Sequence, residues 1–301
     1  MPLLLDLFVV LALAQGAAPR AAAPVLAPPS CKADAGWNDP GTPHHVFGNT
    51  WYVGTCGISA MLVTSDQGHV LIDGATTEAA PLIDANIRAL GLQIKDVRYI
   101  LATHAHLDHA GGFATIQHDS GAVMIARGAD ADAIERGRGD RSDPQFASIA
   151  GFPPVKTVRR IADGETLTLG TTRLTAHATP GHTPGSTSWT WDSCEGARCL
   201  HLAYVDSLTA ISDDEYRYTD EARHPGVVAA FRRSIETVAA LPCDVLLTPH
   251  PTVSNMFARI GSQPSARLAD ANACRALADQ AAKTLDERLA KERATTTRKN
   301  Q

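Results

Sequence analysis

The chain has 301 residues, of which 44% are hydrophobic, enough for one sizeable core or two small ones. Its formal net charge of -5 at pH 7 offers no basic surface for nucleic acid or an anionic membrane. We therefore expect neither a nucleic-acid partner nor a membrane partner.

The first residues predict a signal peptide. Most of residues 3–11 are apolar, and this stretch is too short to span a bilayer of about 30 Å as a helix. Small residues offer two cleavage positions, after Ala14 or after Ala23. We expect residues 1–23 to be a signal peptide, residues 24–301 to form a single domain, and the mature protein to be periplasmic.

From Trp51 onward, strand-like and helix-like segments alternate, which indicates an α/β arrangement. An antiparallel meander is predicted first, with strands at 51–53, 60–64 and 69–73. A helix follows, because Ala79, Ile83, Ile87 and Leu90 share one face and Gly91 supplies a stop signal. A buried strand at 97–102 then leads directly to a histidine-rich run.

That run, Thr103-His104-Ala105-His106-Leu107-Asp108-His109, holds four potential metal ligands within six residues. On an extended strand end, His104 and His106 point to the same side, which suits chelation of one metal ion. Asp108 and His109 come where the chain turns into a helix near residues 110–112, so they can face a second position. Imidazole and carboxylate ligands without thiolate favour zinc, and a pair of ions suits hydrolysis.

A long loop is predicted at 136–154, followed by strand-like pieces at 172–177, 188–191 and 200–205. Two amphipathic helices come last, one carrying Val228, Phe231, Ile235 and Val238, the other running from about 270 to 289.

Two further histidines have settings that suit metal ligands. His182 lies between two Pro-Gly turns that fix the backbone on both sides. His250 ends an apolar strand at 244–250, which echoes the strand at 96–104 because each ends in Thr and a histidine. With the first run, these residues complete two three-ligand sites.

Six cysteines, an even number, fit an oxidising compartment. Cys194 and Cys199 are close enough in sequence to join the two strands of a hairpin. No C-x-x-C pair is present, so we expect structural disulfides and not zinc thiolates. Spacing alone leaves open the pairing of the remaining cysteines, Cys31, Cys56, Cys243 and Cys274.

The motif His-x-His-x-Asp-His, followed by Gly-His-Thr-x-Gly-Ser at 181–186 and a strand-borne His250, resembles the metallo-β-lactamase superfamily, and its subclass B3 most closely. Residues 48–57 and 143–146, with the cysteine layout, are most similar to the Adelaide imipenemase type. The likeness extends from about Cys31 to the last helix.

The resemblance implies a four-layer αββα sandwich of two pseudo-symmetric halves, with the metals at one edge between the sheets. It implies a first zinc ion on His104, His106 and His182, and a second on Asp108, His109 and His250. It also implies three disulfides: Cys31–Cys56, Cys194–Cys199 and Cys243–Cys274.

Substrate contacts are implied in the same way. Ser207 stands where other subclasses place a cysteine ligand, and Ser207 and Thr209 are expected to bind the substrate carboxylate. Gln145 is expected to line the entrance. Asp108 is the expected catalytic residue, since it would ligate zinc and also orient a hydroxide acidified by both ions.

We therefore expect a monomeric di-zinc hydrolase that opens the β-lactam amide of penicillins, cephalosporins and carbapenems and gives antibiotic resistance. One alternative is another hydrolase of the same fold, a glyoxalase II-like thioesterase or a lactonase, in which Asp206 would bridge both metals. Another is a zinc-binding protein that has lost catalysis.

Overall fold

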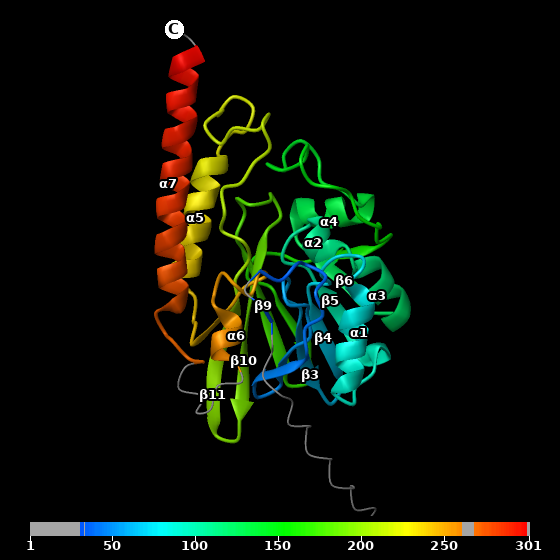
Figure 1. Ribbon diagram of the computed structural model, residues 1–301. Coiled ribbons are helices and arrows are strands. Elements are labelled where there is room, and N and C mark those ends of the chain that lie inside the picture. The colour runs from blue at the N-terminus through cyan, green and yellow to red at the C-terminus, as the bar shows by residue number, and fades with distance from the viewer. Residues whose placement is uncertain (1–30, 33, 261–267, 300–301) are drawn as a thin grey trace, which may run out of the picture.

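The structure is a computed structural model that describes residues 31–32, 34–260 and 268–299. Two β-sheets lie face to face, with helices on both outer sides (Figure 1). This is the four-layer αββα arrangement that the family resemblance implies. The predicted signal peptide, residues 1–23, lies outside the described residues.

The first sheet has seven strands in the order β1-β2-β3-β4-β5-β6-β7. The first four strands pair antiparallel, and the predicted meander corresponds to β2, β3 and β4. From β4 to β7 the pairing is parallel, because helices connect these strands. The strands are β1 (His44–Phe47), β2 (Thr50–Tyr52), β3 (Met61–Ser65), β4 (Gly68–Ile72), β5 (Val97–Leu101), β6 (Val123–Ala126) and β7 (Val158–Arg160). The helical segments are α1 (Ala80–Ala89), η1 (Ile94–Asp96), α2 (Leu107–Ala110), α3 (Phe113–Ser120) and α4 (Gly128–Arg136).

The second sheet has five strands in the order β12-β11-β10-β9-β8, and only its β11–β12 pair is parallel. Figure 1 shows α5 and α7 on its outer side, opposite the side where α1, α3 and α4 lie. The elements are β8 (Thr166–Leu169), β9 (Thr172–Ala178), β10 (Thr187–Glu195), β11 (Arg198–Tyr204), α5 (Val227–Ala240), β12 (Val245–Leu247), α6 (Met256–Arg259) and α7 (Ala273–Lys299).

Alternation along the strands builds the layers, since successive side chains of a strand point to opposite faces. In β3, Met61 and Val63 pack between the two sheets, whereas Leu62 packs against the helices of the first half. In β11, Leu202 faces the space between the sheets and Ala203 faces the layer that contains α5 and α7. Both faces of each sheet are therefore buried along these strands.

Three disulfides join Cys31 to Cys56, Cys194 to Cys199 and Cys243 to Cys274, as the resemblance implies. Cys194 and Cys199 are directly opposite each other in the β10–β11 hairpin. Among the described residues, none of the helices combines the length and the apolar character needed to cross a bilayer.

The helix expected near residues 110–112 is in fact two short helices. The first, α2, begins earlier than expected, at Leu107, and ends at Ala110; the second, α3, starts at Phe113. Gly112 lies at the break, and only glycine fits there, because a Cβ would lie 2.2 Å from the backbone oxygen of Gly74. The last helix continues beyond the predicted end at 289 and reaches Lys299.

Candidate metal centre

The ligand-bearing turn after β5 is held by a buried carboxylate of the neighbouring strand. Asp73 follows β4, and it accepts hydrogen bonds from the backbone nitrogen of Thr103 at 2.9 Å and from its hydroxyl at 2.8 Å. The backbone of Asp73 has φ +63°, a left-handed conformation that costs free energy outside glycine. The chain is therefore fixed immediately before His104.

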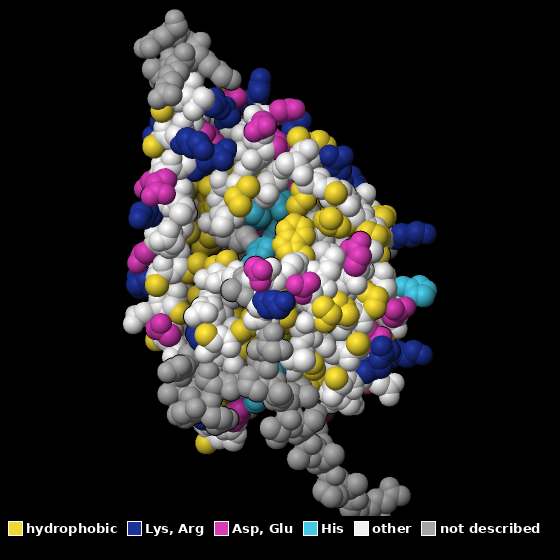
Figure 2. Space-filling view, viewed as in Figure 1, with side chains coloured by type: hydrophobic (Ala, Val, Ile, Leu, Met, Phe, Trp, Pro, Cys, Tyr) yellow, Lys and Arg dark blue, Asp and Glu magenta, His cyan; other side chains and the backbone are white. Residues whose placement is uncertain are grey.

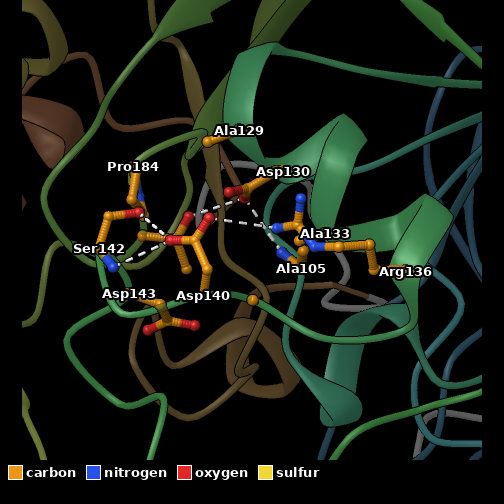
Figure 3. Close-up of a pocket in the computed structure, with 11 residues that line it drawn as sticks. Ala105, Ala129, Asp130, Ala133, Arg136, Asp140, Ser142, Asp143 and Pro184 are labelled. Atoms are coloured by element: carbon orange, nitrogen blue, oxygen red, sulfur yellow. Dashed lines mark hydrogen bonds and ion pairs between the residues drawn. The ribbon is translucent and has the colours of Figure 1, made fainter.

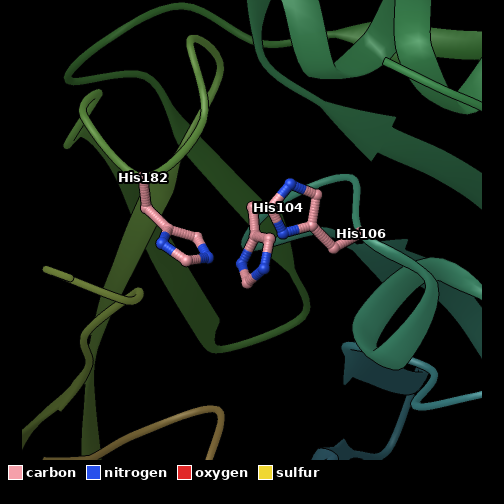
Figure 4. A group of neighbouring side chains, drawn as sticks. All are labelled: His104, His106 and His182. Atoms are coloured by element: carbon pink, nitrogen blue, oxygen red, sulfur yellow. The ribbon is translucent and has the colours of Figure 1, made fainter. Parts of the chain in front are cut away.

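Three buried histidines converge next to this turn, and Figure 4 shows their rings around a common space. His104, His106 and His182 each offer a ring nitrogen, and these atoms lie within 4.8 Å of one another. His182 comes from the other half of the fold, in the loop between β9 and β10. The structure thus brings together the three residues that the sequence assigns to the first zinc ion.

Each of these imidazoles is held through its other ring nitrogen by an oxygen from a distant part of the chain. The contacts are His104 Nδ1 to Asp206 Oδ1 at 2.8 Å, His106 Nε2 to Asp143 Oδ2 at 3.0 Å, and His182 Nδ1 to the Thr209 carbonyl at 3.0 Å. Such contacts fix the tautomer and leave the opposite nitrogen with a lone pair for a metal.

Asp108 lies at the centre of a second group. Its Oδ2 is 3.1 Å from His109 Nε2 and 3.4 Å from His250 Nε2. His104 is also near, since its ring forms a three-ligand cluster with Asp108 and His109. The structure therefore places together all three residues assigned to the second zinc ion, with the first site next to them.

Burial and charge set the protonation of these groups. Burial lowers the pKa of His182 and of His250 to about 4 and that of His104 well below its usual value, so these rings are neutral at pH 7. Burial also opposes the charging of His109, but the adjacent Asp108 outweighs it and raises the His109 pKa to about 9. A metal cation bound beside Asp108 would compete with that proton.

The cluster fits zinc on two independent grounds. Five imidazoles and a carboxylate, with every cysteine in a disulfide, form a nitrogen and oxygen donor set of the kind that zinc accepts. The buried Nε2 nitrogen of His104 has no hydrogen-bond partner among the described residues. Such atoms are costly to bury unless a ligand takes their lone pairs.

A pocket of about 380 Å³ opens above the cluster. Figure 2 shows histidine side chains at the bottom of a hollow, with hydrophobic side chains beside it. Trp37, Ile211 and Val253 line this pocket and are exposed by 47%, 51% and 55%. Apolar side chains with that much exposure around a polar floor are typical of a ligand site.

The predicted substrate residues Gln145, Ser207 and Thr209 all line this pocket. The Gln145 amide nitrogen lies 3.3 Å from His182 Nε2, and the Thr209 hydroxyl lies 3.0 Å from His182 Nδ1. Because the Thr209 carbonyl can accept the Nδ1 proton alone, the hydroxyl is free to turn towards a ligand. The ligand roles of these three residues remain predictions.

Sequence reasoning missed the carboxylates that support the ligands. Asp130, at the start of α4, accepts hydrogen bonds from the Ala105 nitrogen and the Thr183 hydroxyl, and so connects the two ligand loops (Figure 3). Asp143 lies in the loop predicted at 136–154, and Asp73 follows β4. No local motif marks these residues, although Asp73 could have been suspected from its place after a strand beside His104.

Comparison with solved structures gives close matches over most of the chain. The metallo-β-lactamase SMB-1 is 46% identical, with 86% of this chain and 100% of that chain covered and a TM-score of 0.82. MIM-1 from Novosphingobium pentaromativorans is 47% identical, with 88% and 97% covered and a TM-score of 0.84. MEM-A1, a subclass B3 enzyme from a soil metagenome library, is 42% identical, with 86% and 100% covered and a TM-score of 0.84.

Curated relatives are more distant. A probable metallo-hydrolase of Burkholderia pseudomallei (strain 1710b) is 32% identical over 62% of this chain and 66% of its own length. A hydroxyacylglutathione hydrolase of Acidiphilium cryptum (strain JF-5) is 30% identical over 77% of this chain and 82% of its own length. Residues 53–250 match the family described as the metallo-beta-lactamase superfamily. The chain belongs to the metallo-β-lactamase superfamily, and its structural neighbours include subclass B3 enzymes.

Proposed function

We propose that this protein is a di-zinc β-lactamase of subclass B3 that hydrolyses the amide bond of penicillins, cephalosporins and carbapenems. The observation that carries the proposal is the meeting of six ligand side chains beneath an open pocket. Identity of 46–47% to metallo-β-lactamases over 86–88% of the chain supports the same substrate class. Antibiotic resistance would follow from this activity.

His104, His106 and His182 would hold one zinc ion, and Asp108, His109 and His250 the other. Bound zinc supplies Lewis-acid chemistry, which acidifies water and polarises a carbonyl. In the chain itself, Asp108 Oδ2 lies between His109 and His250, and Asp108 and His109 are only 5% and 0% exposed. From there it can accept a hydrogen bond from the attacking water and direct it at the lactam carbonyl.

The pocket wall would orient the substrate. The hydroxyls of Ser207 and Thr209 would donate to its carboxylate, and the Gln145 amide would contact it at the entrance. Trp37 and Ile211 would cover the apolar side of the bicyclic nucleus and exclude water from the reacting bond. These contacts align the amide with the metal centre before bond cleavage.

A thioesterase or lactonase is the second candidate, and the similarity to hydroxyacylglutathione hydrolases favours it. That reading needs Asp206 as a bridging ligand. The Oδ1 atom of Asp206 instead contacts His104 Nδ1 at 2.8 Å, and this makes Asp206 a partner of His104. The identity of 46–47% to metallo-β-lactamases, against 30% to this hydroxyacylglutathione hydrolase, favours the lactamase.

Zinc-loaded protein should hydrolyse a chromogenic cephalosporin and a carbapenem, and a chelator should abolish both activities. Absence of turnover across penicillins, cephalosporins and carbapenems, in protein shown to contain zinc, would reject the proposal. Turnover of a glutathione thioester in the same preparation would favour the second candidate. A zinc-loaded protein inactive on all of these substrates would indicate a binding role.

We further propose that the mature protein is a periplasmic monomer. Three disulfides support an oxidising compartment, because such bonds are rare in the cytosol. Fractionation of cells that express the full chain tests the location, and light scattering of the mature protein tests the oligomeric state.

A further inference from the structure

The side chain of Asp143 connects the pocket loop to a proposed zinc ligand. It lies between α4 and β7 and is only 4% exposed. Its two carboxylate oxygens are 3.2 Å and 3.0 Å from Nε2 of His106, which is 37 residues earlier in the chain. Both partners are buried, so solvent screens this contact weakly.

The contact determines which nitrogen of His106 can bind a metal. A carboxylate only accepts hydrogen bonds, so the proton of a neutral His106 ring must lie on Nε2. Nδ1 then carries the lone pair, and it is the nitrogen left to meet His104 and His182. With the proton on Nδ1 the same ring could not act as a ligand there.

Asp143 also makes a contact within its own loop. Its Oδ1 accepts a hydrogen bond from the backbone nitrogen of Gln145 at 2.8 Å. The loop has another anchor, since Asp213 accepts from the Ala147 nitrogen at 2.8 Å. A substitution that keeps Oδ1 therefore keeps the loop contact, and it removes the oxygen that makes the shorter contact with His106 Nε2.

We infer that Asp143 is a positioning residue that fixes the His106 tautomer and thereby sets the affinity of the first zinc site. The inference rests on the proposed two-zinc function. Carboxylate partners of ligating histidines generally contribute about 10- to 100-fold in metal affinity.

The decisive variant is Asp143→Asn. Asparagine keeps the shape and one oxygen for the Gln145 nitrogen, but its NH2 group would face Nε2 and favour the proton on Nδ1. We expect one of the two zinc ions to bind about 10- to 100-fold more weakly, while the other keeps its affinity. If Asp143 served only to hold the loop, Asn would behave as the wild type.

Zinc affinities are measured by competition with a chromophoric chelator, and hydrogen exchange of residues 138–150 reports on the loop. Asp140→Asn is the matched control, because Asp140 lies in the same loop and is exposed. Among the contacts described, its side chain bonds only to Ser142 and to Arg136 at the end of α4. Asp140→Asn should bind both ions as the wild type does. Asp143→Asn with two wild-type affinities would overturn the inference.

A measurement on the unmodified protein gives an independent test. Long-range proton–nitrogen correlation spectra of the zinc-free protein should show His106 protonated on Nε2. Protonation on Nδ1 would overturn the inference even if the variant failed to fold. A wild-type protein that binds no zinc would instead refute the proposed function itself.

Discussion

Replacement of Asp130 by alanine should destabilise the fold strongly. Asp130 is 3% exposed and holds two ligand loops together. Its Oδ2 accepts from the Ala105 nitrogen at 3.1 Å and from the Thr183 hydroxyl at 2.7 Å, and its Oδ1 accepts from the Gly185 nitrogen at 2.9 Å. Ala105 separates His104 from His106, and Thr183 follows His182, so one carboxylate sets the spacing of the first site.

The size of the destabilisation can be estimated from the hydrogen-bond donors that lose Asp130 as their acceptor. The Thr183 hydroxyl keeps a contact with Ser186 Oγ at 2.9 Å, so its loss is partial. The backbone nitrogens of Ala105 and Gly185 lose their acceptor, and each buried unsatisfied donor costs about 1–3 kcal/mol. We therefore expect Asp130→Ala to lower the free energy of unfolding by roughly 2–6 kcal/mol, against a typical total of about 5–15 kcal/mol.

Urea unfolding of the zinc-free protein measures this loss without interference from the metal. Asp132→Ala is the control, because Asp132 is also in α4 but exposed, in an ion pair with Arg160. Exposed pairs contribute about 0–1 kcal/mol, so this variant should unfold almost as the wild type does. A loss below about 1 kcal/mol for Asp130→Ala would refute the reasoning, because water would then be satisfying both nitrogens.

Three further outcomes follow from the site. His182→Ala should retain one zinc ion by metal analysis and lose at least about 100-fold in kcat for a carbapenem; two retained ions would contradict the ligand assignment. Ser207→Ala should raise KM more than it lowers kcat, because its hydroxyl is proposed to bind a remote carboxylate; steady-state kinetics decide this. The zinc-free protein should lose stability as the pH falls from about 6.5 towards 4, because burial lowers the His182 pKa to about 4 and the unfolded chain takes up that proton first. Thermal unfolding in chelator should show a smaller loss for His182→Ala over this range.

Much of the fold could be predicted because its signals are local. Alternating apolar residues marked the strands of the meander, and the one-sided apolar pattern from Ala79 to Leu90 marked α1. The short strands β1, β6, β7 and β8 were missed. β1 contains His44 and His45, and β6 is a four-residue apolar run that periodicity cannot distinguish from part of a helix.

The four-layer order, by contrast, needed the family resemblance. Apolar residues on both faces of β4 indicate that the strand is buried on both sides, but not what covers either side. Strands β11 and β12 pair although they are more than 40 residues apart and α5 lies between them in the chain. The sequence of neither strand indicates which strand it pairs with. The substrate assignment depended on the resemblance for the same reason.

In the metal centre too, the local features could be predicted from the sequence and the long-range contacts could not. The spacing of the histidine motif was enough to predict His104, His106 and His109 as ligands. Residues this close together in one turn lie near one another in any fold of the rest of the chain. The oxygens that hold the rings are 102 residues away for His104 and 27 residues away for His182. A relative could therefore keep the whole histidine motif and still bind zinc weakly, if a position such as Asp143 no longer supplied a carboxylate. The motif specifies where ligands can be, whereas the partners specify which nitrogen each ligand presents.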